Sequence, residues 1–306
     1  MNIFMATSFT NGFMPGQTTN AKLNEVERNI VENRPHLLES YHYVHSQSYV
    51  NKMRENNAKV FLDSGAFSAH SLGVNINIFD YCNYIKANKD IIRVEDGDLL
   101  ASVLDGIGDP LQTYRNQLTM EANGVRPLPC FHFGEDERYL EYYVNNYSYI
   151  TIGGMVGKPV QTLVKWLDRI WEKYMIDGTG SARLKVHAFG ITSVHIMERY
   201  PWFSVDSSSW IQYAVFGHIF TENERVIAVS EKSPARQVAG KHLTNYSEIE
   251  RNKVLQDLEK DGFTLERLAS VYESRAVYNS LTFKKINERI NKKPIKVFRK
   301  QVQELF

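Results

Sequence analysis

Cysteine is scarce in this sequence: Cys82 and Cys130 are the two examples among 306 residues. They lie far apart, in segments typical of a helix and of a buried strand. This spacing argues against a disulfide framework and against a cysteine-rich zinc site, and it fits a reducing, intracellular setting best.

Long apolar stretches and an excess of charge are also missing. No run of about 18 apolar residues occurs, and the N-terminal segment MNIFMATSFTNG lacks both a basic start and a sustained apolar stretch. We therefore expect a soluble, cytoplasmic protein without a membrane partner. The 36 Lys and Arg residues nearly balance 35 Asp and Glu residues, which argues against a uniformly basic surface that coats nucleic acid.

Basic charge is instead concentrated near the C-terminus. Residues 281–302 contain eight lysines and arginines and a single acid, Glu288, so their local net charge is +7. Such a run holds phosphates in some proteins and forms a solvated helix face in others, and the sequence leaves both interpretations open. The candidate phosphate contacts are Lys292, Lys293, Arg299 and Lys300.

Short apolar runs, rich in β-branched and aromatic residues, alternate with segments of helical spacing. Most of the interior runs are almost continuously apolar, which is typical of strands covered on both faces. In residues 160–175 the apolar side chains recur on one helical stripe. This alternation predicts parallel β-α units. The eight candidate strands are 2–7, 59–62, 101–104, 127–133, 149–152, 184–189, 202–205 and 225–229.

Eight strands that alternate with helices predict an α/β fold of the (β/α)8 barrel type, the TIM barrel, over residues 1–240. Residues 241–306 are more charged and have helical spacing, with Thr264 as a candidate N-cap before Leu265. We expect this part to be a helical appendage that ends in the basic tail.

Four of the predicted strand ends carry an acid or a glycine pair. Because the carboxyl ends of parallel strands meet at one face, we expect Asp63, Asp105 and Asp206 to converge there. The four segments are FLDSGAFS (61–68), SVLDGIGDP (102–110), ITIGGMVG (150–157) and FSVDSSSW (203–210).

Each of these segments also has a purely structural explanation. The three serines after Asp206 can keep a nucleophilic carboxylate ionised, but an aspartate before a helix is also a common N-cap. Asp63 and Asp105 fit turns equally well. The pair Gly153 and Gly154 fits a phosphate cradle, a tight turn or a backbone contact with a planar ligand.

In this order, the segments resemble the motifs of the tRNA-guanine transglycosylase superfamily, whose members exchange guanine for a 7-deazaguanine in nucleic acid. DSGAFS resembles the family's DSGG(Y/F)Q motif, LDGIGDP its FDEC segment and IGGMVG its GGLAVG segment. HAFGIT is similar to YLMGVG, and FSVDSSSW is similar to the nucleophile segment MFDCVLPTR. The resemblance covers residues 61–212, about half of the chain.

The resemblance implies a role for each acid. Asp206 is the nucleophile that attacks C1′ of the target nucleotide and forms a covalent glycosyl-enzyme. Asp63 is the general acid and base, and Asp105 accepts hydrogen bonds from the base's N1–H and amino group. Base exchange with retention requires two displacements, and hence a nucleophilic carboxylate beside one that alternates between acid and base. The target base must leave the stack, and neither a cofactor nor a metal is implied.

Other matching positions are expected to contact the base. The backbone of Gly154 and Met155 would meet its edges, and Phe67 and Phe189 would stack on it, although barrel core explains Phe189 equally well. Further candidate substrate-binding residues are Ser64, Gly153, His132 and His187. For the two histidines, the alternative is a hydrogen-bonded place in the core.

Two features depart from the tRNA enzymes. No cysteine follows Cys130, so the zinc subdomain of the family is not expected, and CFHFGED replaces the family's VQG segment, with His132 the nearest polar residue. The chain therefore looks more like the phage and genomic-island branch, which inserts 7-deazaguanines such as preQ0 into DNA. The expected partners are DNA, a free 7-deazaguanine base and a protein that opens the duplex, in the host cytoplasm if a phage encodes the chain.

Three other functions remain open. One is the same base exchange on tRNA. Another is a catalytically silent subunit that binds nucleic acid or a partner enzyme, although such a subunit has no need of all three acids. The last is an unrelated barrel enzyme, such as a sugar hydrolase or a lyase with a metal held by Asp105 or His132.

Overall fold

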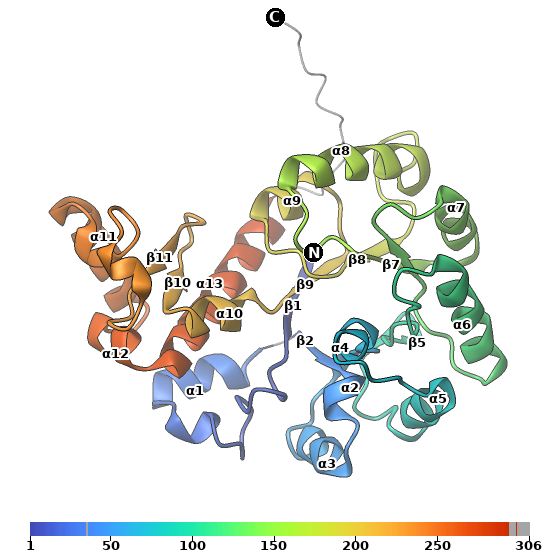
Figure 1. The fold of residues 1–306 in the computed structure, drawn as a ribbon, viewed down its shortest axis with the longest axis horizontal. Coiled ribbons are helices and arrows are strands. Elements are labelled where there is room, and N and C mark those ends of the chain that lie inside the picture. Colours follow the sequence, from blue (N-terminus) through green and yellow to red (C-terminus); the bar gives the residue numbers. More distant parts are fainter. Residues whose placement is uncertain (35, 294–297, 299–306) are drawn as a thin grey trace, which may run out of the picture. The chain divides into compact units, whose positions relative to one another are not determined.

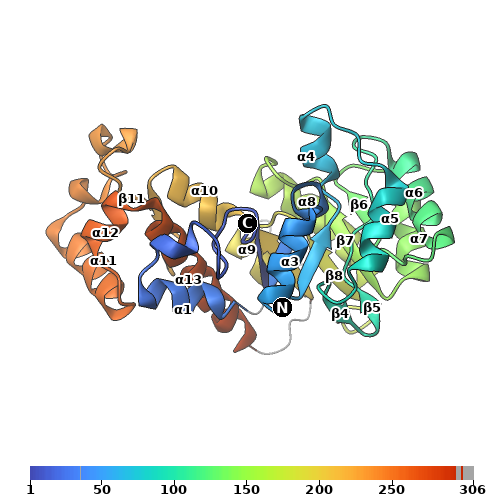
Figure 2. The same cartoon turned by 90° about the horizontal axis from the view of Figure 1, so that it is seen from below.

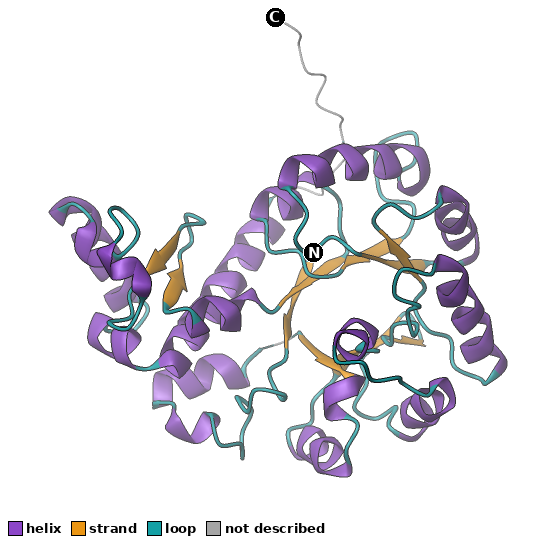
Figure 3. Cartoon of the chain, viewed as in Figure 1, coloured by secondary structure: helices purple, strands orange, loops and turns teal. Residues whose placement is uncertain are grey.

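In the computed structural model, which describes residues 1–34, 36–293 and 298, seven parallel strands form one curled sheet flanked by helices (Figures 1 and 3). Their order in space is β3-β2-β1-β9-β8-β7-β6. The predicted α/β class and its parallel pairing are confirmed. The strands are β1 (Asn2–Ala6), β2 (Leu37–Ser40), β3 (Val60–Asp63), β6 (Cys130–His132), β7 (Tyr149–Gly153), β8 (Lys185–Ala188) and β9 (Ser204–Ser207).

The predicted strand at 101–104 is present only as isolated bridges. Leu62 pairs with Ala101, and Ser102 pairs with Leu128, both in the parallel sense. The Ser102 amide donates to the Leu62 carbonyl at 2.9 Å, and the Leu128 amide donates to the Ala101 carbonyl at 2.8 Å. This segment therefore bonds to β3 and to the approach to β6 without forming a continuous ladder.

One predicted strand does not belong to this sheet, and one strand of the sheet was not predicted. Residues 225–229 contribute β11 (Val226–Ala228), which pairs antiparallel with β10 (His218–Phe220) in a separate hairpin. The unpredicted strand is β2, whose sequence LLES is half polar. Glu39 in β2 is buried, and it accepts hydrogen bonds from the amides of Phe9 at 2.6 Å and Thr10 at 3.3 Å.

The chain divides into two compact units. The first comprises the described residues of 1–10, 36–207 and 290–298, and the second comprises those of 11–34 and 208–289. This division differs from the expected boundary at residue 240. Local sequence patterns could not reveal it, because the second unit combines segments that lie far apart in the chain.

Helices of the first unit follow the strands of the curled sheet. Figure 2 shows α4 at one end of the sheet and the hairpin of β4 (Val94–Glu95) and β5 (Asp98–Leu99) at the other. Because α4 follows β3 directly, the end of the sheet at which α4 lies is the carboxyl end of the strands. The helices are α2 (Tyr41–Val44), α3 (Gln47–Glu55), α4 (Ala66–Ser71), α5 (Ile78–Ala87), α6 (Pro110–Ala122), α7 (Glu137–Asn146), α8 (Val160–Ile170) with the π-helix Trp171–Met175, and α9 (Val194–Arg199).

The second unit is mainly helical. As predicted, Thr264 caps α12, since its hydroxyl accepts from the Arg267 amide at 3.4 Å. Arg267 also pairs with the buried carboxylate of Glu27 at 2.6 Å. The elements are α1 (Glu25–Glu32), α10 (Ser209–Val215), α11 (Glu248–Lys260), α12 (Leu265–Ser270), α13 (Tyr272–Asn291) and the 3-10 turns Asn20–Lys22, Pro234–Gln237 and Leu243–Asn245. Among the described helices of the whole chain, none combines the length and apolar character needed to cross a membrane.

An aromatic and aliphatic cluster fills the inside of the curled sheet. At its centre Phe61 is fully buried, with its ring 5.6 Å from Phe4, 4.6 Å from His187 and 5.8 Å from Phe189. Alternate residues of a strand share a face, so polar residues two positions after a cluster member also face inward. The cluster comprises Phe4, Ala6, Leu38, Phe61, Leu100, Leu128 and Tyr149.

Two phenylalanines of neighbouring segments test this arrangement. We expect Phe61→Ala to lower the free energy of unfolding by about 3–5 kcal/mol, because it leaves a cavity among rings. Phe67→Ala is the matched control: Phe67 is 70% exposed, and its removal should change the free energy by about 0.5 kcal/mol or less. Urea unfolding measures both, and equal losses for the two variants would contradict the placement of Phe61.

Candidate active site

The three acids predicted from the sequence do converge at the carboxyl ends of the strands. Asp63 ends β3, two residues after the core residue Phe61, and Asp206 lies in β9, two residues after the buried Ser204. Asp105 follows the bridged segment between them. The charges of Asp105 and Asp206 both act on Asp63 and raise its pKa, which places the three carboxylates in one electrostatic site.

Two of the structural explanations for these acids do not hold. The turn before Pro110 spans residues 106–109, where the Asp109 amide donates to the Gly106 carbonyl at 2.8 Å, so Asp105 lies just before this turn. Helix α10 begins after Ser208, and Asp206 lies within strand β9. Asp63 does form the predicted turn, since its Oδ2 accepts from the Gly65 amide at 2.9 Å.

Asp63 has the electrostatic properties of a general acid and base. Burial raises the pKa of its carboxyl to about 7, and Asp105 and Asp206 add to the effect, while hydrogen bonds from Gly65 and Ser102 oppose it. The Ser102 hydroxyl donates to Oδ1 at 3.3 Å. A carboxyl with this pKa is partly protonated at neutral pH, and it can both give and take a proton there.

Asp206 is held through one of its two oxygens. Its Oδ1 accepts from the Gly190 amide at 2.9 Å and lies 3.3 Å from Nε2 of the buried His187. A chain of contacts continues behind the ring: His187 Nδ1 lies 2.7 Å from Ser204 Oγ, which lies 2.7 Å from Tyr149 Oη. Burial lowers the pKa of His187, against the effect of Asp206, so a neutral imidazole supports the carboxylate. His187 is thus a hydrogen-bonded core histidine that also touches the candidate nucleophile.

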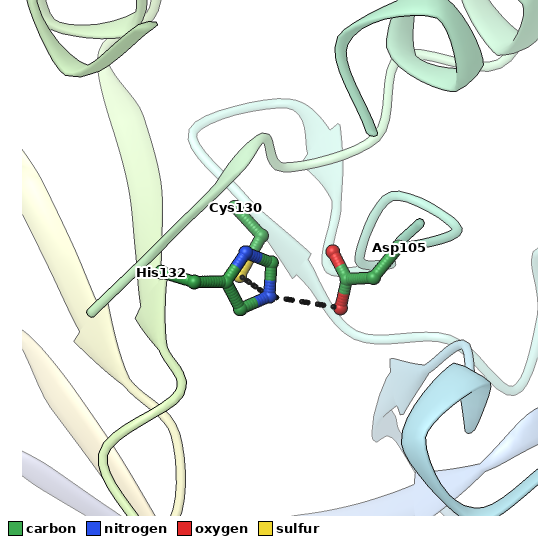
Figure 4. Close-up of side chains that lie close together, drawn as sticks. All are labelled: Asp105, Cys130 and His132. Carbon is green, nitrogen blue, oxygen red and sulfur yellow. Dashed lines mark hydrogen bonds and ion pairs between the residues drawn. The ribbon is translucent and has the colours of Figure 1, made fainter. Parts of the chain in front are cut away.

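Asp105 belongs to a second polar cluster, with Cys130 and His132 of β6 (Figure 4). His132 Nε2 lies 3.4 Å from Asp105 Oδ2 and 3.4 Å from Cys130 Sγ, while its Nδ1 lies 2.9 Å from Glu135 Oε1. Burial opposes a charge on His132, but Cys130 and Asp105 outweigh it and raise the pKa of the imidazole. Within the described part of the chain, Asp105 Oδ1 is buried without a hydrogen-bond partner.

The glycine pair makes room for this cluster. A Cβ on Gly153 would lie 2.9 Å from His132 Cδ2 and 3.2 Å from Cys130 Sγ, so only glycine fits beside them. Gly154 follows with a φ of 71°, in the left-handed region that favours glycine. Met155, a candidate base contact, is buried. The pair therefore has a packing role, and its other candidate role, a contact with the base, stays a prediction.

The remaining candidate substrate contacts differ in exposure. The ring of Phe67, in the first turn of α4, is exposed, whereas Phe189 is partly buried and packs 4.7 Å from His187. Ser64 is buried, and its amide donates to Ser102 Oγ at 2.9 Å. Phe67 is therefore free to stack on a ligand, while Phe189 serves the core and borders the site.

A cavity of about 420 Å³ opens beside Asp105, within the volume range of small-molecule sites. A larger cavity of about 600 Å³ lies among Met1, Lys185 and Phe203. That cavity is at the amino ends of β1 and β8, whereas the smaller one is lined by Asp105 but not by Asp63 or Asp206. The latter is lined by Ala66, Ala69, His70, Val74, Asn75, Ile76, Ile78, Leu104, Asp105, Gly106, Ile107, Gln112 and Asn116.

The structure does not bring the start of the basic tail to the acids. Asn291 accepts from the Met1 amino group and donates to the Met1 carbonyl, each at 2.8 Å, at the amino end of β1. Lys292 is exposed there, and Lys293 pairs with Glu198 at 2.7 Å. Arg299 and Lys300, the other two candidate phosphate contacts, lie outside the described residues.

Several supporting residues escaped the sequence analysis. Ser102, Ser204 and Glu135 hydrogen-bond the candidate site residues, yet each is a common residue type without a motif of its own. Ser204 had one usable signal, its position two residues before Asp206 in a strand, which places both on one face. Glu135 is set by the turn that follows β6, and only the folded turn reveals its contact.

No family model and no curated protein matches this chain. The resemblance of its five segments to guanine transglycosylases therefore stays a hypothesis that depends on the residues themselves.

The raised pKa of Asp63 predicts a pH dependence of stability. The carboxyl binds its proton more tightly in the folded state, so its stabilising contribution is complete below pH 3.8 and is lost as the pH rises to about 7. Over this range, we expect the free energy of unfolding of wild type to fall by a few kcal/mol relative to that of Asp63→Asn, whose side chain stays neutral. Urea unfolding at a series of pH values measures the difference.

Two features control this experiment. Glu39, whose buried carboxyl also has a pKa raised to about 7, is present in both proteins and cancels from the difference. Asp177→Asn, at an exposed turn, should show no such loss: hydrogen bonds from Thr179 and Ser181 lower the pKa of Asp177, so wild type gains stability relative to this variant as the pH rises. A constant difference between wild type and Asp63→Asn across the range would contradict the raised pKa.

Proposed function

We propose that this chain is a guanine transglycosylase, which exchanges guanine in DNA for a 7-deazaguanine such as preQ0 through a covalent aspartyl-glycosyl intermediate. The observation that carries the proposal is the convergence of Asp63, Asp105 and Asp206, with the pKa of one acid raised to about 7. This is the pair of unlike carboxylates that a double displacement at a sugar carbon requires, together with an acid that reads the base.

The proposal includes a closed (β/α)8 barrel. Seven strands form the curled sheet, and the predicted strand at 101–104 would be the eighth, between β3 and β6. The bridges Leu62 to Ala101 and Ser102 to Leu128 support this topology. Catalytic groups of such barrels lie at the carboxyl ends of the strands, where these acids are found.

Asp206 would supply the nucleophilic oxygen. The contacts with Gly190 and His187 both involve Oδ1, so Oδ2 is the oxygen left to attack C1′. In the first displacement the Oδ2–C1′ bond forms, the C1′–N9 bond breaks, and Asp63 gives its proton to the departing guanine. In the second, Asp63 takes the N9 proton of the incoming 7-deazaguanine, whose N9 attacks C1′ and releases the Asp206 carboxylate. Atoms and protons balance, and Asp63 returns to its protonated form.

Asp105 would select the base. A buried carboxylate oxygen without a hydrogen-bond donor is costly, and a bound ligand with N–H groups would satisfy it. Asp105 Oδ1 is in this state within the described residues, and Asp105 lines the 420 Å³ cavity. The N1–H and amino group of a guanine-like edge provide such donors.

The choice of DNA over tRNA depends on the sequence after Cys130, which contains no cysteine for the zinc subdomain of the tRNA enzymes. The same exchange on tRNA is the second candidate. Neither choice alters the roles of the three acids, because both polymers present the same base and the same C1′ carbon.

Trapping of the covalent intermediate tests the proposal. We expect an adduct that survives denaturation when the protein is incubated with guanine-containing DNA, as seen by gel and mass spectrometry. Asp206→Asn should abolish it, and Asp63→Asn should slow base exchange about 10²–10⁴-fold. Asp177→Asn removes a carboxylate from an exposed turn and should leave the adduct intact.

The other outcomes are equally informative. An adduct with tRNA alone would overturn the choice of DNA and keep the mechanism. Firm binding of either polymer with neither an adduct nor exchange of preQ0 would favour a catalytically silent subunit. An adduct that persists in Asp206→Asn would reject Asp206 as the nucleophile.

A further inference from the structure

Three side chains of different chemistry, those of Asp105, Cys130 and His132, meet and form a set of metal donors. Cys130 and His132 are two residues apart in β6 and therefore share its inner face, while Asp105 reaches them from the segment before α6 (Figure 4). The carboxylate oxygen, the sulfur and the imidazole nitrogen lie within 4.8 Å of one another.

Two of the three donor separations are those of a tetrahedral zinc site. Bond lengths of about 2.3 Å to sulfur and about 2.0–2.1 Å to nitrogen and oxygen put the donors of a tetrahedral zinc about 3.3–3.6 Å apart. Nε2 of His132 lies 3.4 Å from Cys130 Sγ and 3.4 Å from Asp105 Oδ2. A zinc ion could therefore enter with small movements of the three side chains.

Glu135 prepares the histidine for this role. Its Oε1 lies 2.9 Å from His132 Nδ1, and its Oε2 accepts from the His132 amide at 2.9 Å. A carboxylate that accepts from Nδ1–H is the usual support of histidine ligands, because it makes Nε2 the nitrogen that releases its proton and binds the metal. Gly153 contributes space, since a Cβ there would lie 2.9 Å from the His132 ring.

A nucleophilic cysteine is the competing explanation of Cys130, His132 and Glu135, which have the order of a Cys-His-acid triad. Two observations speak against it. Cys130 is 1% exposed, so a substrate carbonyl has no approach to its sulfur. Asp105 Oδ2 is as near to His132 Nε2 as Cys130 Sγ is. The nitrogen that would take the thiol proton therefore already contacts a carboxylate.

We propose that Asp105, Cys130 and His132 bind one zinc ion, with a fourth position left for water or a substrate donor. The inference goes beyond the proposed base exchange and does not depend on it. The two share Asp105: a metal on Oδ2 leaves Oδ1 to accept from a base. This donor set of thiolate, imidazole and carboxylate favours zinc over magnesium or calcium, which prefer oxygen ligands alone.

Cobalt provides the test, because a cobalt ion bound by a thiolate has a charge-transfer absorption that oxygen and nitrogen ligands do not give. The full-length protein is stripped with a chelator and titrated with Co²⁺ and then Zn²⁺, without nucleic acid or base. We expect one equivalent of Co²⁺ to produce the band and Zn²⁺ to displace it. Because Cys82 is the single other cysteine, a band retained in Cys82→Ser assigns the ligand to Cys130 even if a Cys130 variant fails to fold.

Variants then test the other residues. Glu135→Gln should weaken zinc affinity about 10–100-fold, and His132→Ala should abolish the band. Absence of the band in wild type, or its loss in Cys82→Ser, would overturn the proposal. Rapid alkylation of Cys130 in the folded, metal-free protein at neutral pH would also overturn it, in favour of the nucleophile. The DNA adduct is measured separately, so failure of either proposal can be told apart from failure of the other.

Discussion

Three carboxylates, one buried and two partly buried, lie at one end of a curled sheet, and this is the constraint on which the site depends. Carboxylates this close cannot all ionise freely in a desolvated site. Asp63 keeps a proton near neutral pH, because burial and its two acidic neighbours raise its pKa. Asp206 has a backbone amide on Oδ1, and Asp105 has an imidazole beside Oδ2. Three aspartates thus acquire different properties from their surroundings.

The aromatic core below the acids maintains these differences. Phe61, His187 and Phe189 pack with ring centroids 4.6–5.8 Å apart. His187 belongs to both layers: its ring packs on Phe61, and its nitrogens reach Asp206 and Ser204. Movement of this ring would alter the packing of the core and the support of the candidate nucleophile together, which couples stability to the geometry of the site.

Two candidate chemistries border each other at Asp105. One oxygen lies in a cluster with the donors of a zinc ion, and the other is buried without a hydrogen-bond donor in the described part of the chain. A carboxylate can serve a metal and a base at the same time, because its two oxygens point in different directions. Asp105 is therefore the residue at which base recognition and metal binding would influence each other.

The sequence alone determined the strand and helix alternation, the positions of the three acids at strand ends, and the N-cap at Thr264, because periodicity and capping are local properties. The sequence did not predict β2, because Glu39 interrupts the apolar pattern of that strand. The Glu39 carboxylate accepts hydrogen bonds from the amides of Phe9 and Thr10. Only the tertiary structure decided that 225–229 leaves the sheet for a hairpin, that Gly153 accommodates His132, and that the described start of the basic tail lies at the opposite end from the acids. The last two depend on contacts between residues distant in the chain, which no local pattern specifies. The hairpin pairs residues near in the chain, but its periodicity does not tell whether a strand joins the parallel sheet or its neighbour.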